Sequence, residues 1–120
     1  MIHLEEVILG HPITVTASPA GRDWNVMILG GCAPHVGSVS LAEYKNGEVA
    51  LRTLLRDTHK DQIVGDEFAR TLARQTRSTV CVSCGIHYDG PDNAGLTSIV
   101  ACTSRLLNTL CEIIKKESTQ

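Results

Sequence analysis

Residues 38–55 read SVSLAEYKNGEVALRTLL, and this stretch decides the fold class because it predicts a β-hairpin. Residues 38–44 form the first expected strand, and residues 49–55 alternate in hydrophobicity as the second. Lys45-Asn46-Gly47 lies between them, and an Asn-Gly pair supplies the positive backbone φ angles that a tight turn requires. We therefore expect two neighbouring antiparallel strands here.

Two more strands are expected before this hairpin. Residues 13–17 alternate between apolar and polar side chains, and residues 18–21, SPAG, are expected to form the turn that ends this strand. The apolar character of residues 24–29 is typical of a strand covered on both faces, and the pair Gly30-Gly31 is expected to end it.

The second half of the chain predicts two helices around one strand. From Asp61 onward apolar residues recur at four-residue spacing, which indicates an amphipathic helix with Asp61 as its cap. Residues 79–85 predict an inner strand, residues 89–92 a turn, and residues 96–116 the longest helix. This order predicts an α+β fold: a mainly antiparallel sheet of about five to six strands with two helices packed on one face.

The whole chain, residues 1–120, is expected to form a single domain, because 120 residues leave room for one hydrophobic core. The composition, 42% hydrophobic and 20% charged, is that of an ordinary soluble globular protein. A sheet covered on one side leaves an exposed face or edge, which favours a homodimer.

Composition also narrows the function. A formal net charge of −2 leaves no excess of positive charge to neutralise the phosphates of a nucleic acid. Aromatic residues make up 3% of the chain, so a flat cofactor must be held mainly by aliphatic side chains and backbone. Five cysteines, an odd number, and an N-terminus without signal-peptide character favour a reducing cytoplasm. No apolar run approaches the roughly 20 residues that span a membrane.

A glycine-rich loop is expected between the strands at 24–29 and 38–44. Residues 30–37, GGCAPHVG, contain three glycines and a proline, and such a backbone lets its N–H groups approach a phosphate or carboxylate closely. The pattern matches neither a Walker loop nor a dinucleotide fingerprint. A tight strand connection with a surface histidine explains these residues equally well.

Two further segments carry histidines beside the ends of predicted elements. Residues 58–61, THKD, precede a helix whose free N–H groups and dipole favour an anion, although plain helix capping is the alternative. Residues 84–90 follow the inner strand, where His87 and Asp89 can orient each other or a ligand. A turn in which Asp89 bonds its own backbone explains this segment as well.

Redox, metal and nucleophilic chemistry are less favoured by the pattern. Cys81 and Cys84 form a CxxC pair, but residues three apart on a strand point to opposite faces. His35, His59 and His87 with a carboxylate would suit zinc or iron, but their separation follows no metal signature. No local motif supports a nucleophile beside the inner strand. The sequence therefore predicts a site that holds a ligand, with no catalytic residue and no metal.

Together the three segments resemble a known family. The resemblance rests on three motifs that occur in order along most of the chain: Gly30-Gly31-x-x-Pro34-His35-x-Gly37-x-Val39, His59-Lys60-Asp61 and Gly85-Ile86-His87-Tyr88-Asp89. They are similar to the small D-type subunit of hydroxyarylic (gallate-type) decarboxylases, the LpdD-like prenylated-flavin chaperone family. The resemblance implies a fold like that of proteasome-assembly-chaperone domains.

The resemblance also implies a function. It suggests a non-catalytic protein that binds prenylated FMN and supports maturation of a UbiD-type decarboxylase, whose large subunit would be its partner. A flavin prenyltransferase is a second candidate partner. The cofactor-binding residues expected on this basis are Gly30, Gly31, Pro34, His35, Gly37, His59, Lys60, Asp61, His87 and Asp89. Two alternatives stay open: a decarboxylase-associated interaction subunit that binds no cofactor, and a small metal-dependent enzyme.

Overall fold

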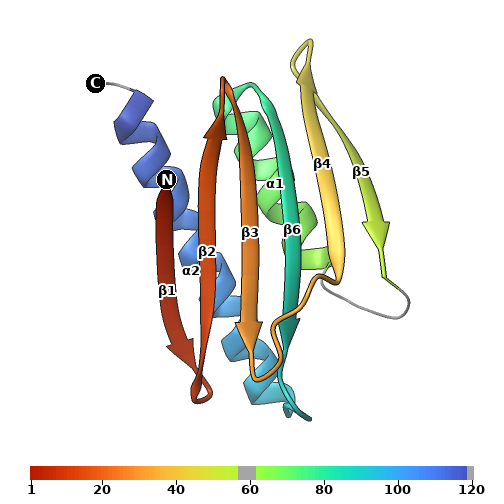
Figure 1. Ribbon diagram of the computed structural model, residues 1–120, viewed down its shortest axis with the longest axis vertical. Coiled ribbons are helices and arrows are strands. Elements are labelled where there is room, and N and C mark those ends of the chain that lie inside the picture. The colour runs from red at the N-terminus through yellow and green to blue at the C-terminus, as the bar shows by residue number, and fades with distance from the viewer. Residues whose placement is uncertain (57–61, 119–120) are drawn as a thin grey trace.

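The computed structural model describes residues 1–56 and 62–118. The protein has a single six-stranded sheet, and both helices lie behind it in the view of Figure 1. In chain order the elements are β1 (Ile2–Ile8), β2 (His11–Ala20), β3 (Asp23–Gly31), β4 (Ser38–Lys45), β5 (Glu48–Leu55), α1 (Gln62–Thr76), β6 (Thr79–His87) and α2 (Asn93–Ser118). The expected mainly antiparallel sheet with two helices on one face is confirmed. Within the described ranges, neither helix is long and apolar enough to cross a membrane.

The order of strands in the sheet is β1-β2-β3-β6-β4-β5. Four neighbouring pairs are antiparallel, and β3 and β6 run parallel to each other. Because β6 lies between β3 and β4, the connection from β3 to β4 must cross the end of β6. This crossing is made by the glycine-rich loop.

The expectation of four strands before the first helix is wrong, because β1 precedes them as a fifth. Two consecutive charged residues, Glu5 and Glu6, interrupt the alternation that would have indicated a strand. Glu6 lies on the side of β1 that carries Ile2, and its carboxylate pairs with the guanidinium of Arg105 on α2. The ion pair explains how a strand tolerates a charge facing the helices.

The expected turn at residues 18–21 is also misplaced, because β2 continues to Ala20 and the chain turns at Gly21 and Arg22. Pairing between β1 and β2 ends at Ala17, opposite Ile2. Pro19 therefore lies beyond the reach of β1, and its missing N–H removes no hydrogen bond to that strand.

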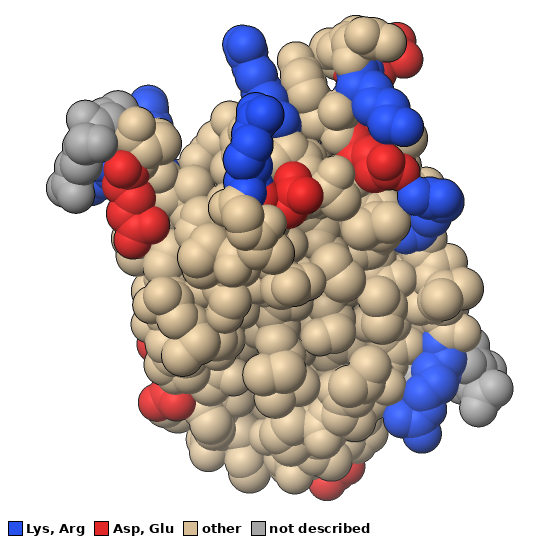
Figure 2. All heavy atoms as spheres, turned by 45° about the horizontal axis from the view of Figure 1, so that its top comes forward, with Lys and Arg blue, Asp and Glu red and all other residues tan. Residues whose placement is uncertain are grey.

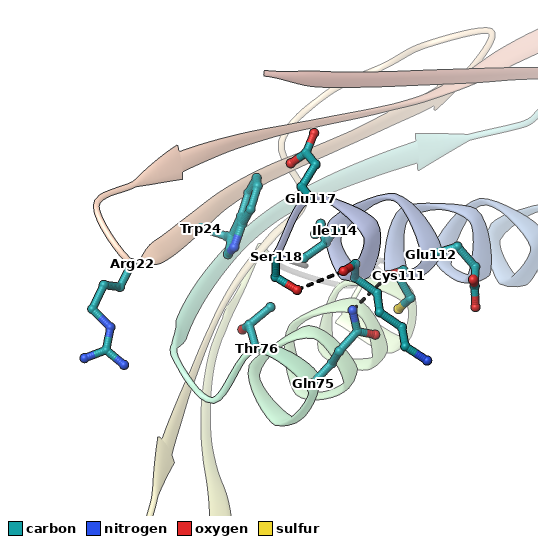
Figure 3. Close-up of a pocket in the computed structure, with 10 residues that line it drawn as sticks. Arg22, Trp24, Gln75, Thr76, Cys111, Glu112, Ile114, Glu117 and Ser118 are labelled. Carbon is teal, nitrogen blue, oxygen red and sulfur yellow. Dashed lines mark hydrogen bonds between the residues drawn. The ribbon is translucent and has the colours of Figure 1, made fainter. Parts of the chain in front are cut away.

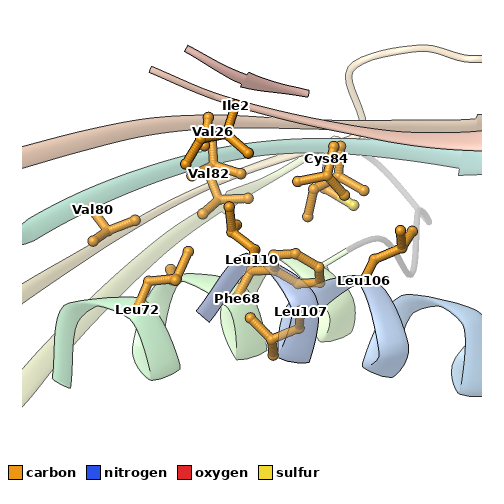
Figure 4. Packing of buried hydrophobic residues seen from close by; sticks show 14 of the residues in the cluster. Ile2, Val26, Phe68, Leu72, Val80, Val82, Cys84, Leu106, Leu107 and Leu110 are labelled. Atoms are coloured by element: carbon orange, nitrogen blue, oxygen red, sulfur yellow. The ribbon is translucent and has the colours of Figure 1, made fainter. Parts of the chain in front are cut away.

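The core fills the space between the sheet and the two helices (Figure 4). Phe68 and Leu72 of α1 and Leu110 of α2 meet Val26 and Val82 from the sheet, and all five are buried. Burying a side chain of this kind contributes about 1.5–3 kcal/mol before conformational entropy is subtracted. The helical periodicity seen in the sequence marks the residues that face this layer.

The other face of the sheet is open. On β3, Val26 and Ile28 are buried against the helices, whereas Asn25 and Met27 are exposed. The expectation that both faces of this strand are covered is therefore wrong, because both helices pack on the same side. Figure 2 shows charged side chains gathered at the end with the β2–β3 and β4–β5 turns, and a middle region that carries few.

Candidate ligand site

The parallel strands β3 and β6 bring two of the sequence motifs to one edge of the sheet, at the bottom of Figure 1. Gly31, at the end of β3, lies opposite His87, at the end of β6. The next backbone N–H, that of Cys32, donates to the carbonyl oxygen of His87 at 2.9 Å. Residues 30–37 and 84–90, far apart in sequence, are thereby joined.

Two glycines are required where the backbones meet. Gly31 has a φ of +85°, and a Cβ added to it would lie 1.8 Å from the carbonyl oxygen of His87. The loop then passes over β6, where a Cβ on Gly85 would lie 1.6 Å from the carbonyl oxygen of His35. Gly37 completes the crossing by donating its N–H to the carbonyl of Cys84 at 2.9 Å. These glycines allow close packing of backbone on backbone.

Gly30, another expected contact residue, faces the core. A Cβ there would meet Cγ1 of Ile13 on β2 at 2.8 Å. Its lack of a side chain therefore has a packing role between β2 and β3. Gly30 is buried, and Pro34 in the middle of the loop is exposed.

His35 has a defined ring orientation. Its Nδ1–H donates to the carbonyl oxygen of Ala33 at 3.0 Å, and because a carbonyl accepts only, this bond assigns the proton to Nδ1. The His35 side chain is partly buried, and its own carbonyl lies against Gly85. His35 and His87 thus belong to the same edge, one on the loop and one at the end of β6.

An exposed cluster of three polar side chains lies beside this crossing. Nε2–H of His87 donates to Oδ1 of Asp89 at 2.9 Å, and this bond is the main reason that the pKa of Asp89 is lowered. A hydrogen bond from Cys32 lowers the Asp89 pKa further. The Cys32 thiol also lies 3.5 Å from the carbonyl oxygen of His87. No local sequence pattern relates Cys32 to residue 87, so only the tertiary structure reveals this neighbour.

The third motif cannot be placed, because His59, Lys60 and Asp61 lie outside the described residues. The last described residue before them is Arg56, whose backbone N–H donates to Gly37 at 2.8 Å. Its guanidinium donates to the carbonyl of Val36 at 3.2 Å. Arg56 was not predicted as a site residue, although a basic residue at the end of a strand next to 58–61 was an available signal.

A depression of about 210 Å³ lies beside the loop. Its wall is mainly apolar, and three of its hydrophobic side chains are exposed to solvent: Val36, Leu54 and Leu55. Arg56 supplies the positive charge at the same place, and Gly37, Ser38 and Val39 complete the lining. The arrangement suits a ligand with a flat apolar part and an anionic part.

Ser38 has a buried hydroxyl that lacks a partner. The residue is 2% exposed, and its Oγ is the buried side-chain polar atom for which no hydrogen bond is found in the described part of the chain. Its neighbour on the same face of β4, Ser40, donates to Oδ1 of Asp66 at 2.7 Å, and Thr53 donates to the same oxygen at 2.6 Å. A buried hydroxyl without a partner has hydrogen-bonding capacity to offer.

A larger pocket, of about 650 Å³, lies at the opposite end of the molecule (Figure 3). It is bounded by Trp24 on β3 and by the C-terminal parts of both helices. None of the expected site residues in the described part of the chain lines it. Arg22 and Lys115 are balanced there by Glu112 and Glu117, so the lining does not favour an anion. In the smaller depression the cation lies next to the loop, so this depression is the candidate ligand site.

Comparison with known proteins defines first the class of fold and then the family. A crystal structure of a chaperone complex for yeast 20S proteasome assembly has a similar fold, with a TM-score of 0.56 and 13% sequence identity over 97% of this chain and 96% of that chain. At this identity the likeness establishes the fold alone. The family model of the prenylated flavin chaperone LpdD-like domain matches residues 9–115, so the chain belongs to that family. No curated protein matches it.

Proposed function

We propose that the protein is a non-catalytic maturation factor that binds prenylated FMN and supports a UbiD-type aromatic acid decarboxylase in the cytoplasm. The observation that carries the proposal is the edge where β3 and β6 end, because it joins two motifs of the family to an apolar depression and to Arg56. Membership of the prenylated flavin chaperone family supports a chaperone role. We also propose that residues 1–120 act as one domain.

The residues beside the loop fit this type of cofactor. A flavin mononucleotide needs an apolar surface for its ring system and a cation for its phosphate. Leu54 and Leu55 offer the apolar surface, Arg56 offers the cation, and the buried hydroxyl of Ser38 lies in the same lining. His35 would add a ring nitrogen at the border of the loop. Prenylated FMN supplies the decarboxylation chemistry in the partner enzyme, whereas these residues would bind and orient it.

The size of the depression suits a protein that passes its ligand on. Its volume of about 210 Å³ is below the roughly 300–1,000 Å³ of pockets that enclose a small molecule. A flavin held there would stay partly exposed. Incomplete enclosure is a disadvantage for storage, but it lets a partner enzyme reach the cofactor.

An anaerobic titration with reduced prenylated FMN, followed by absorbance or calorimetry, tests the proposal. Wild type should bind, and Arg56→Ala should weaken binding about 10- to 150-fold, the equivalent of one charge-assisted hydrogen bond of about 1.5–3 kcal/mol. His35→Ala should weaken it by about 1–3 kcal/mol. Arg22→Ala is the matched control, because Arg22 lines the opposite pocket. If wild type does not bind the flavin, the proposal is rejected. If only Arg22→Ala loses binding, the flavin site is the pocket at the opposite end of the molecule.

The main alternative is an interaction subunit that binds no cofactor. It predicts that the large decarboxylase subunit is still captured by a variant in which His35, His59 and His87 are all replaced, while wild type fails to bind the flavin. Our proposal predicts flavin binding by wild type whether or not the partner is present.

We further propose that the protein is a homodimer formed through the open face of the sheet. Met27 on β3 is 43% exposed and Val7 on β1 is 63% exposed, and both belong to this face. A second copy of the same chain would cover these exposed apolar side chains. Sedimentation should show a dimer for wild type and a monomer for Met27→Glu. A wild-type monomer at high concentration would contradict this.

A further inference from the structure

A thiol, an imidazole and a carboxylate converge where β3 and β6 end. Cys32, His87 and Asp89 each offer one ligand atom, and these atoms lie within 4.8 Å of one another. In residues 1–56 and 62–118 this is the one group of three Cys, His, Asp or Glu side chains that meets this condition. All three are exposed, so an ion can reach them from solvent.

The backbone holds the three residues in place without help from a ligand. Cys32 belongs to the loop after β3, His87 is the last residue of β6, and Asp89 follows two residues later. The hydrogen bond from Cys32 N–H to His87 fixes the two segments, and Gly31 makes the close approach sterically possible. Because this framework is part of the sheet, binding would need only side-chain rotations.

The donor set selects the kind of ion. Thiolate sulfur and imidazole nitrogen favour a borderline or soft transition metal, and one carboxylate oxygen is compatible with it. Zn²⁺ binds such atoms at about 2.0–2.3 Å in a tetrahedron, which places neighbouring nitrogen and oxygen ligands about 3.3 Å apart. Nε2 of His87 and Oδ1 of Asp89 are now 2.9 Å apart, joined by a hydrogen bond. A shift of a few tenths of an ångström would let the ion replace that shared proton.

We propose that Cys32, His87 and Asp89 form a binding site for Zn²⁺, with the fourth coordination position left to water or to an external ligand. On binding, the Cys32 thiol releases its proton to solvent, and His87 ligates as neutral imidazole through Nε2 with its proton on Nδ1. No oxidation or reduction is involved. The site goes beyond the proposed flavin function, although His87 and Asp89 are common to both.

Cobalt(II) titration of the metal-free, reduced full-length chain in the absence of flavin tests this inference. Wild type should take up one equivalent of Co²⁺ with the visible bands of tetrahedral coordination and a thiolate-to-cobalt charge-transfer band, and Zn²⁺ should displace it. Cys32→Ser should abolish the charge-transfer band. Cys111→Ser, which alters another partly accessible cysteine far from the cluster, should keep it.

Further variants separate ligands from neighbours. Loss of a residue that only hydrogen-bonds to a metal ligand reduces metal affinity roughly 10- to 100-fold. His87→Gln and Asp89→Asn each remove a ligand itself, so each should reduce the affinity for Co²⁺ by at least this factor. Circular dichroism confirms that each variant is folded. The inference is overturned if wild type shows no saturable uptake, or if the charge-transfer band survives in Cys32→Ser. Neither result affects the flavin titration when that titration is made with metal-free protein.

Discussion

The backbone N–H of Cys32 donates to the carbonyl oxygen of His87 across 55 residues of sequence, at 2.9 Å. This bond continues the parallel pairing of β3 and β6 by one residue beyond the strand. It places the glycine-rich loop next to the segment that carries His87 and Asp89. Both the flavin proposal and the zinc proposal use this junction, so its stability is worth testing separately.

Alanine at Gly31 should destabilise the protein more than alanine at Gly47. The two glycines have φ angles of +85° and +82°, so both variants carry the same cost of a left-handed backbone. A Cβ at Gly47 meets nothing within 4 Å, whereas one at Gly31 collides with His87. We expect an additional loss of about 1–3 kcal/mol for Gly31→Ala in urea unfolding. Equal losses of stability in Gly31→Ala and Gly47→Ala would mean that the backbone where β3 and β6 end moves aside without an energetic cost.

Alanine at Ser40 should cost stability, and alanine at Ser38 should not. Ser40 donates to the carboxylate of Asp66, and a hydrogen bond to a charged group contributes about 1.5–3 kcal/mol. The Ser38 hydroxyl has no hydrogen-bond partner among the residues that the structure describes, so Ser38→Ala should change stability by less than about 0.5 kcal/mol or increase it. Chemical denaturation of the two variants checks this. A large loss in Ser38→Ala would reveal a partner for that hydroxyl.

The ion pair between Glu6 and Arg105 should make stability depend on pH. The hydrogen bond from Arg105 lowers the pKa of Glu6 below its ordinary value of 4.5. The stabilisation is therefore present above the unfolded-state pKa and is lost as the pH falls through the lower folded-state pKa. Glu6→Gln should unfold more easily than wild type at neutral pH, and this difference should disappear in acid.

A neighbouring glutamate provides the control for this measurement. Glu5 lies on the opposite face of β1, away from the helices. Glu5→Gln should therefore leave the pH profile of unfolding close to that of wild type. If the Glu6→Gln difference persisted below the folded-state pKa, loss of packing rather than loss of charge would be its cause.

The five cysteines should differ strongly in reactivity. Cys32 is exposed, whereas Cys84 and Cys102 are fully buried. Burial, together with the charge of Glu6, raises the pKa of Cys102 to about 11, so its thiolate is scarce at neutral pH. Mass spectrometry after brief alkylation should find Cys32 modified first, and Cys84 and Cys102 modified only after denaturation. Labelling of Cys102 in the native protein would contradict the packing of α2 on the sheet.

Local physical chemistry allowed much of the fold to be predicted from the sequence. In the hairpin, Lys45 pairs with Glu48 across Asn46 and Gly47, which both adopt positive φ as an Asn-Gly turn requires. The helical stripes identified Phe68 and Leu110 correctly as core residues. The prediction failed at β1, where Glu6 depends on Arg105, a residue 99 positions away. A local pattern cannot contain such a partner.

The sequence by itself determined the strands with clean alternation, both helices and the three histidine-bearing motifs, since these depend on neighbours within a few residues. Only the tertiary structure decided that β6 lies between β3 and β4. That order brings Cys32 to His87 and Asp89, and it sets the β3–β4 loop beside Arg56. The physical reason is that sheet order is fixed by burial and pairing summed over the whole chain, so residues distant in sequence become a site only when the sheet forms.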